Sequence, residues 1–208
     1  MQRPIYIIIF SVLISCNTKQ IKSDALTLNN ELHNIYRLDQ QYREQLSNLP
    51  PTSTMTMELW KKQNLLDSIN LIRVTKVLDS IGFPHKPLFD DSAGTATFMV
   101  IQHATLQQQE KYLPLFQTAA DQNQIKPSLV ALMVDRVRVG KGQKQIYGTQ
   151  AVPIKDPKTG YMTDKYELAP IEDEENVNQR RLKVGLPTIE EGAKELGVDY
   201  MPKKKSGS

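Results

Sequence analysis

Polar side chains that could carry chemistry interrupt the most apolar segments of this 208-residue chain. Gln102 and His103 follow the apolar run 96–101, and Asp135 and Arg136 follow the run 129–134. Further polar residues lie on a predicted strand: Gln145, Tyr147, Thr149 and Gln150. Because an unpaired buried polar group costs about 1–3 kcal/mol, these groups are expected to satisfy one another. They would form either a structural network or the floor of a site.

His103 is the strongest catalytic candidate, because the ordinary pKa of an imidazole, about 6.5, suits proton transfer at neutral pH. Asp135 could orient its ring as a hydrogen-bonded acid, and Tyr147 could donate a proton or a hydrogen bond. These three residues would form a metal-independent acid–base site for hydrolysis or group transfer. The structural alternative is that His103 is a hydrogen-bonded core residue at the end of a buried helix.

Other polar residues could bind a ligand beside these three. Arg136 could bind an anionic group, Gln145 and Gln150 could position a substrate, and Arg181 with Arg180 could hold a carboxylate or phosphate through parallel hydrogen bonds. The predicted ligand-binding set is Gln102, Arg136, Gln145, Thr149, Gln150 and Arg181.

Each of these residues also has a structural interpretation. Asp135 lies three residues before Arg138, the spacing of a routine helix ion pair. Arg180 and Arg181 could pair with local acids such as Glu174 and Glu175, and Asp39 with Arg43 has the i,i+4 spacing of a helix salt bridge.

Motifs for metals, phosphates and activated serines are missing from the sequence. His33, His85 and His103 do not fit an HExxH or HxH pattern, and Gly140-Lys141-Gly142 lacks the spacing of a P-loop. No GxSxG elbow occurs. The sequence therefore predicts neither a metal nor a cofactor.

The single cysteine follows the one strongly apolar run, PIYIIIFSVLIS at 4–15. At twelve residues this run is too short to span a bilayer with ease and favours a secretory signal. Leu13-Ile14-Ser15-Cys16 resembles the lipobox of bacterial lipoproteins, which implies lipidation of Cys16 and cleavage before it. We therefore expect a signal peptide at 1–15 and a lipidated tether at 16–23. The alternative is a plain signal or short anchor with an incidental cysteine.

Charge agrees with a lipid anchor better than with a polyanionic partner. The net charge is +3, and no basic stripe of the kind that nucleic-acid-binding proteins carry is present. The sequence thus predicts attachment to a membrane through lipid on Cys16 in the bacterial cell envelope, and no nucleic acid. The other partner would be a small molecule or an envelope protein.

Hydrophobic periodicity predicts that a mainly helical domain positions these residues. We expect helices over 24–49, 57–81, 95–105, 106–121 (with a break at Pro114), 127–140, 172–183 and a short one from Pro187. Turn residues at 155–160 between two strand-like runs predict a β-hairpin at about 145–169. The fold class is thus mainly α, a single domain over 24–200 with an appended β-hairpin, followed by a disordered tail at 201–208.

Several short elements occur in an order that resembles the bacterial domain-of-unknown-function family 6624. They are Gln-His-Ala at 102–104, Asp-Arg-Val at 135–137, Tyr-Gly-Thr-Gln at 147–150, Pro-Ile-Glu-Asp at 170–173, Asn-Gln-Arg-Arg at 178–181 and Val-Gly-Leu-Pro at 184–187. Gly-Phe-Pro at 82–84 and the stretch 39–43 also fit, whereas Thr105 stands where many relatives carry an aspartate. The resemblance implies a shared fold and no particular activity.

Two functions follow as hypotheses. The first is a cell-envelope lipoprotein with a ligand-binding or protein-interaction role around a buried His, Asp, Arg and Tyr cluster. The second is a metal-independent hydrolase or transferase with His103 as general base. Convergence of His103, Asp135 and Tyr147 on an open pocket would favour the enzyme, and complete internal hydrogen bonding would favour the first.

Overall fold

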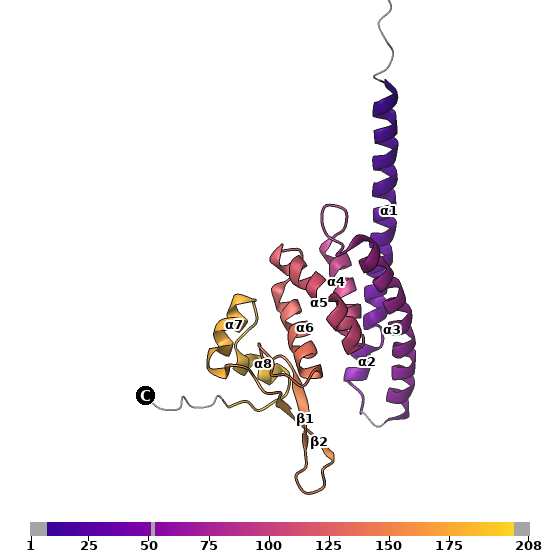
Figure 1. Cartoon of the computed structure of the whole chain (residues 1–208). Helices are drawn as coiled ribbons and strands as arrows, with labels where there is room; N and C mark the ends of the chain where they lie inside the picture. Colours follow the sequence, from indigo (N-terminus) through magenta and orange to yellow (C-terminus); the bar gives the residue numbers. More distant parts are fainter. Residues whose placement is uncertain (1–7, 51–52, 202–208) are drawn as a thin grey trace, which may run out of the picture. The chain divides into compact units, whose positions relative to one another are not determined.

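The computed structural model describes residues 8–50 and 53–201, with the side chains described from Gln20 onward except at position 164 (Figure 1). Residues 1–7 of the predicted signal peptide (1–15) and residues 202–208 of the predicted tail (201–208) therefore lie outside the described residues. The chain forms two compact units, 1–103 and 104–208, where the sequence predicts one domain over 24–200. Its mainly helical character with an appended hairpin is confirmed.

Unit 1 consists of helices α1 (Ile8–Gln40), α2 (Arg43–Ser47), α3 (Thr54–Ile81) and α4 (Asp91–Gln102). The predicted tether, 16–23, belongs to α1, because no glycine or proline in it stops the helix. The helix expected over 24–49 is broken after Gln40. At this break the Gln63 side chain accepts the N–H of Tyr42 at 3.1 Å and donates to the carbonyl of Asp39 at 3.0 Å. A side chain from α3 thus satisfies the backbone where the helix ends.

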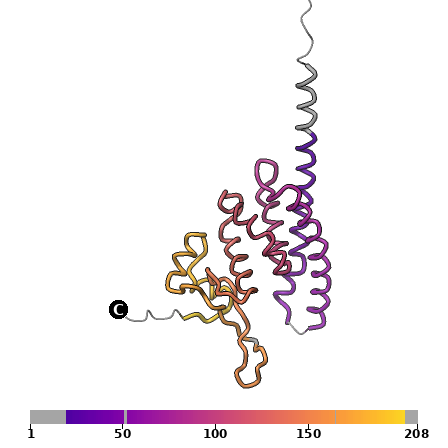
Figure 2. The backbone as a smooth tube through the Cα atoms, viewed as in Figure 1, coloured from indigo at the N-terminus to yellow at the C-terminus, as the bar shows by residue number. Residues whose placement is uncertain are grey.

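The core of unit 1 lies where α1, α3 and α4 pack side by side (Figure 2). Its buried side chains include Leu32 on α1, Val74 on α3, and Phe98 and Ile101 on α4. Helix α4 is buried nearly all round, as the apolar run 96–101 predicts.

Asp90 fixes the start of α4 and ties it to α1. Its carboxylate accepts the N–H groups of Ser92 and Ala93, each at 3.0 Å, and so caps the helix. Asn29 donates to the same carboxylate at 3.0 Å, and the His33 ring lies 2.9 Å from it. The hydrogen bonds from Asn29 and His33 hold the pKa of Asp90 well below its usual range.

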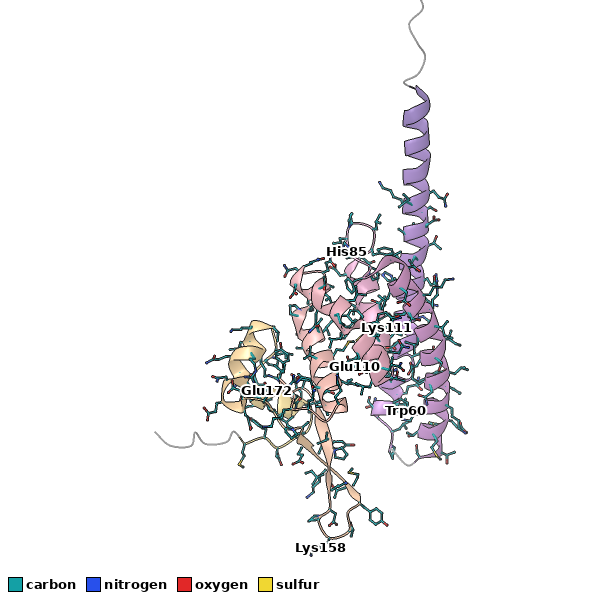
Figure 3. All side chains as sticks on the ribbon, in the orientation of Figure 1. Trp60, His85, Glu110, Lys111, Lys158 and Glu172 are labelled. Carbon is teal, nitrogen blue, oxygen red and sulfur yellow. The ribbon has the colours of Figure 1, made fainter. Side chains whose placement is uncertain are left out.

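Unit 2 contains α5 (Leu106–Asp121), α6 (Pro127–Gly140), strands β1 (Ala151–Lys155) and β2 (Met162–Leu168), the 3-10 turn η1 (Glu174–Asn176), α7 (Val177–Lys183) and α8 (Ile189–Glu195). The predicted break at Pro114 is wrong, because α5 is continuous through it. A proline inside a helix costs about 3 kcal/mol. Two contributions offset this cost. Tyr112 and Phe116 on α5 are buried, and α5 packs against α6. Glu110 on α5, which is labelled in Figure 3, also pairs with Lys141 at 2.7 Å.

The hairpin is shorter than predicted. β1 and β2 pair antiparallel with Ala151 opposite Leu168 and Lys155 opposite Met162, whereas 145–150 form a loop in which Gln145 makes one isolated bridge to Ile171. Lys158 lies at the tip of the hairpin (Figure 3). Beyond the base of the hairpin, Ile171, Val177 and Ile189 form the small core on which α7 and α8 rest.

Among the residues that the structure describes, no helix combines the length and the apolar composition needed to cross a bilayer.

Candidate functional site

His103 ends α4, and the acid beside its ring comes from α1. Nδ1 of His103 lies 3.1 Å from Oδ1 of Asp39. The Asp39 side chain is 1% exposed and that of His103 is 21% exposed. Asp39 therefore takes the orienting position that the sequence prediction gave to Asp135, and that prediction of the partner is wrong.

Asp39 belongs to a network that links α1, α2 and α3. Gln40 donates to its Oδ2 at 2.6 Å, and the Arg43 guanidinium lies 3.6 Å from its Oδ1. Arg43 binds Asp67 more closely, at 2.7 Å, and Gln63 donates to the other oxygen of Asp67 at 2.7 Å. A buried carboxylate needs such donors to be stable as an anion. We call Asp39, Arg43, Gln63, Asp67 and His103 the Asp39 cluster.

The carboxylate of Asp39 determines which ring nitrogen of His103 carries the proton. An ionised carboxylate only accepts, so Nδ1 is assigned as the donor and Nε2 carries the lone pair. No hydrogen bond to Nε2 is found among residues 8–50 and 53–201. An oriented imidazole with a bare Nε2 can accept a hydrogen bond from a ligand, or a proton from a reacting hydroxyl or water.

Asp135 has a different role, which is to organise the loop that follows α6. Its side chain is fully buried, with 0% exposed. Its two oxygens accept the N–H groups of Ile146 at 2.7 Å, Tyr147 at 3.0 Å and Thr149 at 3.0 Å, together with the Thr149 hydroxyl at 2.9 Å. The structural alternative, an ion pair with Arg138, is also wrong, because Arg138 pairs with Glu172.

Two arginines bind the carbonyl groups of the same loop. Arg181 is 2% exposed and donates to the carbonyls of Tyr147 at 2.7 Å and Pro187 at 2.6 Å. Arg180 donates to the carbonyl of Ile146 at 2.9 Å and pairs with Asp173, not with the acids at 174–175. Burial lowers the pKa of Arg181, and the charge of Asp135 opposes that shift. The donors of Arg181 that were predicted to bind a ligand are directed to backbone.

The glutamines of the loop are also used internally. Oε1 of Gln145 accepts the N–H of Gln150 at 2.9 Å, and its Nε2 donates to the carbonyls of Gln150 at 3.0 Å and Ala169 at 2.7 Å. Gln150 donates to the carbonyl of Thr149 at 3.1 Å. The residues 145–150, Asp135 and Arg181 therefore form one structural network, which we call the loop clamp.

The side chains of three other predicted site residues lie in different surroundings. Gln102 is buried at the end of α4, in unit 1 with His103. Arg136 is exposed on α6, and Tyr147, whose backbone belongs to the loop clamp, has a half-buried side chain. Burial and the charge of Asp135 raise the pKa of Tyr147, so its hydroxyl stays protonated and can donate at neutral pH.

Asp39 had a signal in the sequence that residue types alone do not reveal. It continues the apolar stripe Leu28, Leu32 and Ile35 at helical spacing, so a carboxylate occupies a buried position of α1. A buried acid at such a position needs a partner from another helix. Gln63 and Asp67, which complete the cluster, lie on α3 at i,i+4 spacing without any comparable signal.

Within the described part of the chain, no group of three or more His, Cys, Asp or Glu side chains is placed to hold a metal ion.

Comparison with known proteins identifies the relatives of the chain at the level of a family. No curated protein and no solved structure matches it. Thr105, the position where the sequence departs from its expected relatives, caps α5 through its hydroxyl, a role that aspartate also fills well. The family of unknown function DUF6624 matches residues 26–205, which include the Asp39 cluster and the loop clamp, and the chain belongs to this family.

Proposed function

We propose that the protein is a lipid-anchored component of the bacterial cell envelope that binds a small ligand at the Asp39 cluster. The ligand would carry a hydroxyl or amide N–H that donates to Nε2 of His103. The observation that carries this proposal is the 3.1 Å contact between the buried Asp39 carboxylate and Nδ1 of His103. It fixes the ring and leaves Nε2 with its lone pair on a partly exposed side chain.

The loop clamp is a less suitable ligand site than the Asp39 cluster, because its polar groups already have internal partners. The hydrogen-bonding groups of Asp135, Gln145 and Arg181 are occupied by backbone partners. A ligand could engage them only by displacing internal hydrogen bonds, at a cost of about 1–3 kcal/mol for each buried group left unpaired. The Asp39 cluster carries no such cost at Nε2.

A second candidate function, a metal-independent hydrolase or transferase, is favoured by the same pair. A carboxylate that holds Nδ1–H orients the ring and stabilises the imidazolium that forms when Nε2 accepts a proton. His103 would then be the general base that removes a proton from a hydroxyl or water.

Both functions at the site are tested on the full chain by replacing His103 with glutamine. Binding of hydroxyl- and amide-bearing fragments, including N-acetylglucosamine and acetamide, is followed by the ¹⁵N resonance of Nε2 and by fragment-observed NMR. We expect some of these fragments to shift the Nε2 resonance in the wild type. The same fragments should no longer bind to His103→Gln. If the protein is a hydrolase, p-nitrophenyl acetate turnover falls about 10²–10⁴-fold in the same variant.

The matched control is His85→Gln, which changes a histidine on an exposed loop of the same unit. It should leave the fragment-induced shift of the His103 Nε2 resonance and the turnover as in the wild type. Binding that survives in His103→Gln, or a fragment screen that never moves the Nε2 resonance, would contradict a role for the Asp39 cluster.

The anchor is tested separately by Cys16→Ser in a bacterial host fed alkyne-labelled palmitate. The wild-type protein should carry the label and sediment with membranes, because several acyl chains give stable attachment. The variant should lose the label, since a hydroxyl cannot form the thioether. A control change of the neighbouring Asn17 to Gln should keep it. Equal labelling of wild type and Cys16→Ser would rule out this anchor.

A further inference from the structure

An apolar pocket of about 370 Å³ opens in unit 1 between α1 and the segment that connects α3 to α4. Its lining includes Ala25 and Phe83, which are both buried, together with Leu28 and Phe89. His85, which lines the pocket, lies on this connecting segment (Figure 3). Its size falls in the range of small-molecule sites, about 300–1,000 Å³.

The polar residues of the lining are engaged with protein partners. Nδ1 of His85 lies 2.6 Å from the carbonyl of Lys86, and the Lys86 ammonium donates to Asp91 at 2.9 Å. Asp24 accepts the amide of Gln20 at 2.7 Å. A ligand inside the pocket therefore meets mainly aliphatic and aromatic surface, which selects an apolar group without hydrogen-bonding atoms.

Apolar side chains are also exposed at the edge of the pocket. Ile21, Ile81 and Leu88 are 48%, 51% and 46% exposed, and they stand beside the exposed Asp24, His85 and Lys86. Large exposed apolar side chains around an apolar cavity mark a binding surface rather than a solvated one. A flexible hydrocarbon chain would bury this rim and the interior together, whereas a compact ligand would cover only one of them.

The position of the pocket along α1 indicates that the hydrocarbon chain would come from the membrane. Ile21 follows Cys16 by five residues, about 8 Å along a helix. If Cys16 is anchored as proposed, the mouth lies close to the membrane surface; the pocket itself does not depend on that anchor. We propose that the pocket binds one saturated acyl chain of a non-covalently bound lipid.

The test uses the full chain and palmitate that carries a photoreactive diazirine in its chain, with labelled peptides identified by mass spectrometry. We expect labelling within 21–28 and 81–89. Ile21→Glu and Leu88→Glu, which place a carboxylate at the apolar rim, should each lower it at least tenfold. The matched control is Leu26→Glu, which changes a 62% exposed leucine of the same helix outside the lining and should leave labelling unchanged.

Chain length gives a second readout that does not depend on the variants. Each buried CH₂ contributes about 0.8 kcal/mol, so affinity should rise roughly fourfold per methylene and level off once the pocket is filled. Labelling that avoids both 21–28 and 81–89, equal loss in Leu26→Glu, or affinity that rises without a plateau would overturn the proposal.

The source of the chain is decided by comparing the lipid-carrying protein with Cys16→Ala. Both should bind the probe if the ligand is a separate lipid. Binding by Cys16→Ala alone would overturn the proposal, because the anchor's own chain would then fill the pocket. If Cys16→Ser loses membrane attachment but keeps probe labelling, the pocket proposal holds independently of the anchor. If the wild-type protein attaches to membranes but the probe does not label the pocket, the anchor proposal holds and the pocket proposal fails.

Discussion

Replacing Asp135 with alanine is expected to lower the free energy of unfolding by about 3–5 kcal/mol. The change removes the acceptor of three backbone N–H groups, those of Ile146, Tyr147 and Thr149. It also leaves the positive charge of Arg181 without the nearby carboxylate. Urea denaturation followed by far-UV circular dichroism measures the loss, and amide exchange at 146–149 should accelerate more than exchange in α5.

The control for this experiment is Asp121→Ala, at an exposed acid that ends α5. It should change the free energy of unfolding by less than about 0.5 kcal/mol. Asp135→Asn keeps the shape but turns an acceptor into a donor, so it should cost nearly as much as alanine. A loss below about 1 kcal/mol in Asp135→Ala would show that the loop does not depend on this carboxylate.

Replacing Arg181 with methionine is the second change with a large expected effect, again about 3–5 kcal/mol of unfolding free energy. Methionine keeps much of the apolar stem but leaves the carbonyls of Tyr147, Gly148 and Pro187 without their donor. Gly192 shows how closely the guanidinium is enclosed, because a Cβ there would overlap it. The measurement is the same urea denaturation.

Lys183→Met serves as the control, since Lys183 is exposed on the same helix, and it should be nearly neutral. The combination Asp135→Ala with Arg181→Met should cost less than the sum of the two single changes, because both residues hold one loop. Additive losses would mean that the N–H side and the carbonyl side of the loop are stabilised independently.

Much of the helical framework could be predicted from local signals. The bounds of α5 coincide with the prediction because Thr105 caps its first turn, and Pro127 begins α6 at the position where a proline is best tolerated. The break after Gln40 could not be predicted, because the group that satisfies it, Gln63, lies on another helix. The first strand was predicted too long for a similar reason: Asp135 takes the N–H groups that a strand would use.

The candidate site was predicted in part. His103 was identified from its chemistry, but the sequence contains several acids and gives no means of choosing between Asp39, which lies 64 residues before it, and Asp135. The three polar clusters were expected to satisfy one another. Asp135 and residues 145–150 do so, through backbone groups that a pattern of side chains does not reveal, whereas His103 pairs with Asp39 instead. Only tertiary packing distinguishes a buried acid that holds a loop from one that orients an imidazole.

The hairpin has a consequence for how this chain can vary. Gln145 closes its base by hydrogen bonds to Gln150 and Ala169, while Tyr161 and Met162 near its far end are exposed. Residues added or removed around Lys158 would lengthen or shorten two paired strands without reaching the small core or the loop clamp. The tip is therefore the place in unit 2 where a foreign segment, even a whole folded domain, could be inserted with the rest of the unit unchanged.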